Sequence, residues 1–124
     1  MAVTAIEVLQ RYKDENLPAF LGIALTDVNQ VGLFGERPLD VAAVRGDLEE
    51  ILALLEGGAE VNASAEHGNT ALHEAVSQGH AEAVKLLLES EASGEVRNEF
   101  GETPLDIARS RNRYEILAIF EAVK

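Results

Sequence analysis

The stretch Gly68–Ala92 reads GNTALHEAVSQGHAEAVKLLLESEA and predicts two short helices joined by a tight turn. Thr70 suits a helix N-cap, because its hydroxyl can accept a backbone N–H that the first turn leaves unpaired. Apolar residues then recur at spacings of three and four, first around Leu72 and again, after Gly79, around Leu87. Helices this short are not stable alone in water, so the unit must pack against neighbours.

Matching units stand on both sides of this stretch, at a fixed period of about 33 residues. The residues in register include Gly35, Gly68 and Gly101; Leu39, Leu72 and Leu105; and Ala42, Ala75 and Ala108. With this period, the motifs TALHEA in the middle, PLDVAA before it and GETPLDIA after it, the sequence resembles the ankyrin-repeat family. The resemblance implies an all-α solenoid of helix-turn-helix units with protruding, hairpin-like finger loops.

The register divides the chain into a single domain of four units. Residues 31–63 and 64–96 are predicted to be internal repeats, and 97–124 a C-terminal capping repeat. Residues 1–30 are predicted to be a degenerate N-terminal capping repeat, with a non-homologous helical extension as the alternative. In this first unit we expect a helix from about Thr4 to Tyr12 with Ile6 and Leu9 facing inward.

Charge is the second global signal, with 22 acidic against 10 basic residues and a net charge of −12. A field of this sign repels phosphate backbones and speeds encounter with basic proteins. Nucleic-acid binding is therefore disfavoured and a basic partner is favoured. The alternative is that the acids are solvated helix faces that serve solubility alone.

The chain contains no cysteine, which excludes disulfides and thiol catalysis and favours the cytoplasm. Its first residues show no basic start followed by an apolar run, and no stretch has eighteen consecutive apolar residues. We therefore expect a cytoplasmic protein with no membrane segment. We expect it to be a monomer.

Residues suited to catalysis or metal binding are few. His67, His73 and His80 do not have the i, i+4 spacing of a helical zinc site, and the resemblance implies that His73 bonds the turn backbone. No nucleophile elbow or phosphate-binding glycine loop occurs. The acidic pair Glu49 and Glu50 is predicted to be exposed helix surface. The sequence thus predicts no catalytic residue, no metal ligand and no cofactor, and the protein is not expected to be an enzyme.

Partner-binding residues follow from the resemblance, which implies contacts through the finger tips and the exposed side of each first helix. These positions hold Leu33, Phe34, Glu36, Val44 and Arg45; then Glu66, His67, Asn69, Ser77 and Gln78; and then Glu99, Phe100, Glu102, Ser110 and Arg111. Phe34 and Phe100 are predicted to be apolar anchors. The alternative is that each ring folds onto its own finger or covers the end of the stack.

These observations predict a non-catalytic module that binds another protein, a basic one in the first place. A small acidic binder of this kind would suit an inhibitor or an immunity protein that masks a basic enzyme. The alternative from another class is a structural adaptor or self-assembly unit. An enzyme or a metal-binding protein is the least favoured reading.

Overall fold

The computed structural model describes residues 3–123, apart from the side chain of Glu66. Over this range the chain forms seven α-helices and two short 3-10 helices, and no strand. Their bounds are α1 Ala5–Asp14, η1 Pro18–Phe20, α2 Pro38–Arg45, α3 Leu48–Glu56, η2 Glu66–Gly68, α4 Ala71–Gln78, α5 Ala81–Glu89, α6 Pro104–Ser110 and α7 Tyr114–Ala122. The all-α prediction is confirmed.

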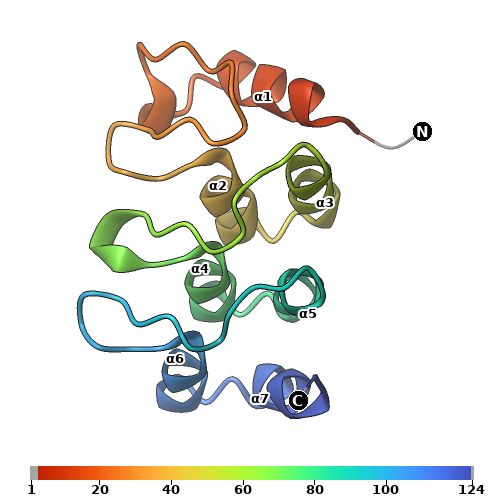
Figure 1. Cartoon of the computed structure of the whole chain (residues 1–124), viewed down its shortest axis with the longest axis vertical. Helices are drawn as coiled ribbons and strands as arrows, with labels where there is room; N and C mark the ends of the chain where they lie inside the picture. The colour runs from red at the N-terminus through yellow and green to blue at the C-terminus, as the bar shows by residue number, and fades with distance from the viewer. Residues whose placement is uncertain (1–2, 124) are drawn as a thin grey trace.

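The helices stack in two columns, as Figure 1 shows. One column holds α2, α4 and α6, the other holds α3, α5 and α7, and long finger loops project beyond the first column. Ala42, Ala75 and Ala108 are fully buried at successive levels of the first column. Since alanine is small, the helix backbones of this column can approach closely. The period predicted from the sequence is therefore also the period at which the helices stack.

Each first helix begins with the same hydrogen bond. Asp40, His73 and Asp106 occupy equivalent positions, and each accepts the backbone N–H of the residue three before it, at 2.8, 3.0 and 3.0 Å. In the middle unit the Thr70 hydroxyl also accepts the N–H of His73, which makes the exchange reciprocal. The Arg37 side chain has no hydrogen-bond acceptor, so at the start of α2 only the bond from the Arg37 N–H to Asp40 forms.

The turns between paired helices are tied to the preceding unit. His80 donates from Nε2 to the carbonyl of Val44 at 2.9 Å, and Arg113 donates from Nη2 to the carbonyl of Ser77 at 2.7 Å. The second pair is the counterpart of the first, one repeat later in the chain. Each satisfies a carbonyl in the last turn of a helix, which the helix itself leaves unpaired.

The finger loops are joined by a second repeating contact. Asn29 donates to the carbonyl of Gly58 at 3.1 Å and accepts the N–H of Glu60 at 2.8 Å. Asn62 makes the equivalent pair of bonds with the following loop. Each asparagine therefore replaces water at two backbone groups of its neighbour, which holds successive loops in a row.

The first unit departs from the register. A helix in register would stack on α2, but α1 lies across α3 and is seen lengthwise in Figure 1, where the other helices are seen nearly end-on. Ala5 lies against Gly57, where a side chain would collide with it, and Leu9 faces the core. Ile6 is 79% exposed, so its predicted inward orientation is wrong. The position of α3, and not the register, sets which face of α1 is buried.

The junction of α1 with α3 is built on Glu50, which is only 1% exposed. Its carboxylate accepts the Tyr12 hydroxyl at 2.6 Å and Arg11 Nη1 at 3.2 Å. The prediction that Glu49 and Glu50 are both exposed is wrong for Glu50. The Glu49 side chain is 59% exposed, whereas Glu50 is enclosed at the junction, and a buried carboxylate needs such donors.

Candidate functional site

Two hollows lie along the column of first helices. The first, here called the N-terminal groove, has a volume of about 360 Å³ and lies between η1, α2, α4 and two finger loops; it is lined by Leu17, Pro18, Ala19, Glu36, Asp40, Val41, Val44, Arg45, Ala65 and Glu74. The second, here called the C-terminal hollow, has a volume of about 190 Å³; it is lined by Asn69, His73, Glu74, Ser77, Asn98, Phe100, Glu102, Ile107, Ser110 and Arg111. Glu74 on α4 borders both.

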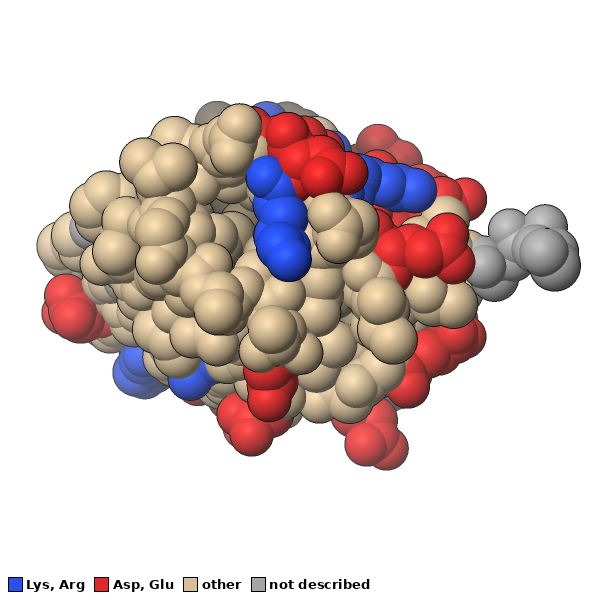
Figure 2. All heavy atoms as spheres, turned by 90° about the horizontal axis from the view of Figure 1, so that it is seen from above, with Lys and Arg blue, Asp and Glu red and all other residues tan. Residues whose placement is uncertain are grey.

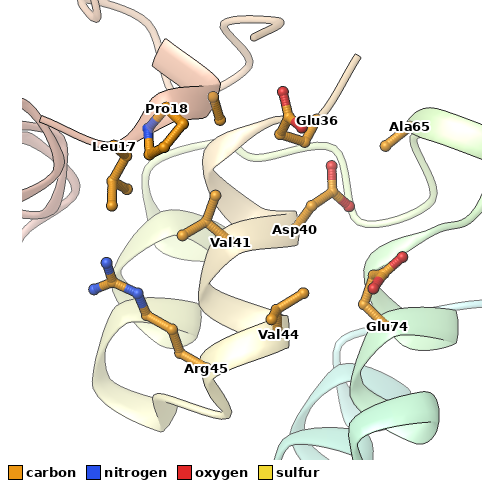
Figure 3. A pocket seen from close by; sticks show the side chains of 10 residues that line it. Leu17, Pro18, Glu36, Asp40, Val41, Val44, Arg45, Ala65 and Glu74 are labelled. Atoms are coloured by element: carbon orange, nitrogen blue, oxygen red, sulfur yellow. The ribbon is translucent and has the colours of Figure 1, made fainter. Parts of the chain in front are cut away.

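The N-terminal groove has apolar walls because η1 covers only part of α2. Pro18 begins η1, where its missing N–H is not needed. Phe20 stacks on the Tyr12 ring with centroids 6.5 Å apart, and the carbonyl of Ala19 accepts the Leu33 N–H at 2.7 Å. These contacts hold η1 beside the groove, where Figure 3 shows Leu17 and Pro18 facing α2.

The opposite side of the groove is lined by the carboxyl groups of Glu36, Asp40 and Glu74 (Figure 3). Burial raises the pKa of Asp40 to about 7; the hydrogen bond from the Arg37 amide opposes this rise, and the negative charges of Glu74 and Glu36 add to it. Asp40 is 6% exposed. The groove is therefore an acidic environment with little water around its deepest carboxyl group.

Arg45, the basic residue of the groove, is engaged within the chain. It forms ion pairs with Glu15 and with Glu50, the latter at 3.5 Å, and its guanidinium lies over the Tyr12 ring at 4.9 Å from the centroid. Sequence reasoning placed Arg45 on the partner-binding surface. The structure places it at the border of the groove, with its charge directed to the first unit.

His73 is a structural residue of the C-terminal hollow. Its Nδ1 accepts the Thr70 N–H, so the Nε2–H donates to the carbonyl of Glu102 in the next unit at 2.9 Å. Burial lowers its pKa, against the bond and charge of Glu102. A neutral ring with both nitrogens in use ties α4 to the third finger, as expected from the sequence.

The finger tips carry the exposed aromatic rings. Phe34 is 55% exposed and Phe100 is 70% exposed. The Phe100 ring contacts the His67 ring of the neighbouring finger, with centroids 5.7 Å apart. Its outer face still remains open to solvent. Leu33 is exposed beside Phe34, and the carboxylate of Glu36 accepts the Phe34 N–H at 3.0 Å.

The structure divides the predicted site residues among these places. The N-terminal groove includes Glu36, Val44 and Arg45, and the C-terminal hollow includes Asn69, Ser77, Phe100, Glu102, Ser110 and Arg111. Neither lining includes Leu33, Phe34, His67, Gln78 or Glu99, which lie on the fingers or at the end of α4. Glu66 lies in η2, and its side chain is outside the described part.

Sequence reasoning missed several residues of the groove, most importantly Asp40 and Glu74. Glu74 has a visible signal, since it precedes Ser77 and Gln78 by three and four residues and so shares their helix face. Asp40 has no such signal, because an acidic residue in the first turn of a helix is already accounted for by the helix dipole. Leu17 and Pro18 had no signal in the register, because η1 has no counterpart in the other units.

Among the side chains that the structure describes, no three His, Asp or Glu residues form a group suited to a metal ion. Between residues 3 and 123, no helix combines the length and the apolar character needed to cross a bilayer.

Comparisons with known proteins agree with the packing. The family model for ankyrin repeats, which describes three copies, matches residues 6–98 and 39–120. No match was found among curated proteins. Ankyrin repeats generally serve as protein–protein interaction modules and are typically not enzymes. Since the matches together cover nearly the whole chain and the two columns repeat in the register of the sequence, this chain belongs to the ankyrin-repeat family.

Proposed function

We propose that this protein is a non-catalytic binding module that holds a partner protein against its finger tips and the concave side of its first helices. The observation that carries the proposal is the exposure of Phe34 and Phe100 on fingers joined in a row. Exposed rings on a preorganised surface bind with little loss of conformational entropy. The fifteen predicted residues are the proposed contact set.

The partner is proposed to be basic. The net charge is −12, and the surface described above contains Glu36, Glu74 and Glu102. Complementary charge raises the rate of encounter and disfavours acidic competitors. An inhibitor or immunity protein that masks a basic enzyme is the narrower form of this proposal, supported by the acidity of the chain. Residues 1–30 are proposed to act as the N-terminal cap of the stack.

The test is a pull-down from native lysate with the protein immobilised, followed by mass spectrometry, using the wild type and the double variant Phe34→Ala and Phe100→Ala. The recovered protein should be basic and should be lost from the double variant, because the two rings would supply the apolar anchors. Recovery should also fall at high salt, where ions screen the acidic surface.

Tyr114→Ala is the matched control. Tyr114 is an aromatic residue on α7 that is 72% exposed, so its loss removes an exposed ring without touching the fingers. Equal recovery with the wild type and the finger variant would contradict the proposal, as would a partner that is acidic.

The second candidate is self-assembly, which the first unit favours. Figure 2, viewed from the end that carries α1 and η1, shows a broad area without charged residues. Ile6 and Leu21 are exposed apolar side chains of this unit, and Val31, directly after it in the chain, is exposed as well. Light scattering distinguishes the two functions, because self-assembly predicts a dimer that Leu21→Asp converts to a monomer, whereas the binding module stays monomeric throughout.

A further inference from the structure

The N-terminal groove combines an apolar wall with an acidic one. One side is apolar, formed by Leu17, Pro18, Val41 and Val44, and the other presents carboxyl groups. An apolar wall favours a hydrocarbon chain, and the carboxyl groups favour a positive end. The two surfaces lie within one hollow of about 360 Å³, near the lower limit of small-ligand sites. This space suits one long side chain with its neighbours.

We propose that the N-terminal groove receives an arginine side chain from an apolar segment of the partner protein. The inference rests on the proposed binding function and adds to it the chemistry of the contact. The alkyl part of the arginine would lie on Val41 and Val44, and the guanidinium would face Asp40 and Glu74. Arginine suits the site better than lysine because its guanidinium is less strongly hydrated and donates in a plane to more than one carboxylate.

The charges around the groove support a cation and oppose an anion. Asp40 and Arg45 come from α2, Glu74 from α4 and Glu36 from the first finger, while η1 contributes no charged residue. The positive charge of Arg37, the residue before α2, also acts on Asp40, and the Arg37 guanidinium donates to the carbonyl of Ser64. Arg45 is paired with Glu15 and Glu50, so its charge is balanced outside the groove. The three carboxyl groups therefore outnumber Arg37, which leaves an excess of acidic groups around the groove.

Asp40 gives the site its selectivity. It is buried and lies close to two other acids, so its ionised form is unfavourable while the groove is empty. A guanidinium placed beside it would favour the ionised form and form a charge-assisted hydrogen bond. A neutral side chain of the same shape would fill the apolar part and bring no positive charge to Asp40.

The experiment uses the tripeptide Leu-Arg-Leu, acetylated and amidated, and the same peptide with citrulline in place of arginine. Citrulline has almost the same shape and no charge. Both peptides are titrated into the isotopically labelled protein, and backbone amide shifts are followed by NMR. We expect the arginine peptide to shift the amides of Ala19, Val41 and Ala65, and to bind at least about tenfold more tightly than the citrulline peptide.

Two substitutions locate the effect, namely Asp40→Asn and Glu74→Gln. Each removes one charge with little change of shape, and Asn can still accept the Arg37 N–H. Each variant should weaken binding of the arginine peptide by roughly tenfold and leave that of the citrulline peptide unchanged. Glu49→Gln is the control, because Glu49 is exposed on α3 and outside the groove. The amide spectrum of each variant verifies its fold.

Three outcomes would overturn the inference: no shift in the groove, equal affinity for both peptides, or equal weakening by Glu49→Gln. These outcomes leave the proposed function intact if the pull-down still depends on Phe34 and Phe100. Conversely, the peptide could bind in the groove while the pull-down shows no dependence on the two rings. That result would exclude the finger tips as the partner-binding surface and leave the groove as a binding site.

Discussion

Asp40 and Asp106 fill the same position in the first turns of α2 and α6, yet their pKa values move in opposite directions. Burial raises the pKa of Asp40 to about 7. Hydrogen bonds from Thr103 lower the pKa of Asp106, and Arg97 and Arg109, at 3.9 and 4.0 Å, contribute to the same direction. The two residues therefore share a role in helix capping and differ in charge behaviour.

The difference comes from their levels in the stack. Asp40 lies in the groove between η1 and α4, where Glu74 is a neighbour and little water enters. Asp106 lies in the last unit, and its side chain is 42% exposed. The same repeat position thus makes the same hydrogen bond to the backbone in both units, while the pKa of its carboxyl group depends on the neighbours of each unit. In this chain the unusual acid is found where the first unit covers the second.

Breaking the junction between α1 and α3 should have the largest effect, both on stability and on the difference between Asp40 and Asp106. Glu50→Ala should lower the free energy of unfolding by about 3–5 kcal/mol, because it leaves the Tyr12 hydroxyl and two arginines without their buried acceptor. The pKa of Asp40 should then fall towards that of Asp106, since η1 is held through α1. Chemical denaturation and carboxyl-carbon NMR measure the two effects.

Glu49→Ala is the matched control, since the Glu49 side chain is 59% exposed and its ion pair with Arg11, at 3.7 Å, is open to solvent. Its effect should stay below about 1 kcal/mol. Equal destabilisation by the two variants would show that Glu50 does not hold the first unit.

The same capping position in the middle unit should show an intermediate effect. His73→Ala removes the acceptor for the Thr70 N–H and the donor to Glu102, and both partners are then left without these bonds. We expect a loss of about 2–3 kcal/mol. Asp106→Ala removes an acceptor at a more exposed site and should destabilise less. Thermal and chemical denaturation of both variants test this order, and the reverse order would contradict it.

The smallest effect is a pH dependence with opposite signs at the two aspartates. The folded pKa of Asp40 lies above its ordinary value of 3.8, so its stabilising contribution is complete below about pH 4 and is lost as the pH rises through about 7. Asp40→Asn cannot ionise and should gain stability relative to the wild type over this range. We expect a gain on the order of 2 kcal/mol.

Asp106 should show the reverse. Its folded pKa lies below 3.8, so its contribution is present above that pH and is lost as the pH falls. Asp106→Asn should therefore lose stability relative to the wild type as the pH rises through the acid range. Unfolding curves of the wild type and the two variants between about pH 3 and pH 8 give the change of unfolding free energy with pH for each variant relative to the wild type. Changes of the same sign would show that the two aspartates do not differ in this way.

Much of the repeating structure was predictable from sequence. The first-helix caps at Thr70 and Thr103, the turn glycines Gly46 and Gly79, and the structural role of His73 all follow from local chemistry repeated at a fixed interval. Gly46 and Gly79 adopt positive φ at the ends of α2 and α4, where other residues would be strained. Local rules succeed here because each unit meets nearly the same neighbours.

The first unit and the groove were not predictable in this way. Glu50 stands next to Glu49 with the same composition around it, and only its position opposite Tyr12 makes it a buried acceptor. Its register counterparts, Ala83 and Ile116, are apolar, which was the one available sign that Glu50 has a special neighbour. The register also carries no sign that α1 packs across α3.

The sequence by itself determined the period, the helix pairs, the caps and the acidity of this protein, because these depend on residue types at fixed short spacings. Only the tertiary structure decided that α1 crosses α3, that η1 leaves an apolar hollow beside α2, and that Asp40 is buried among acids. Burial and electrostatic environment depend on which distant segments meet, and a local pattern carries no such information.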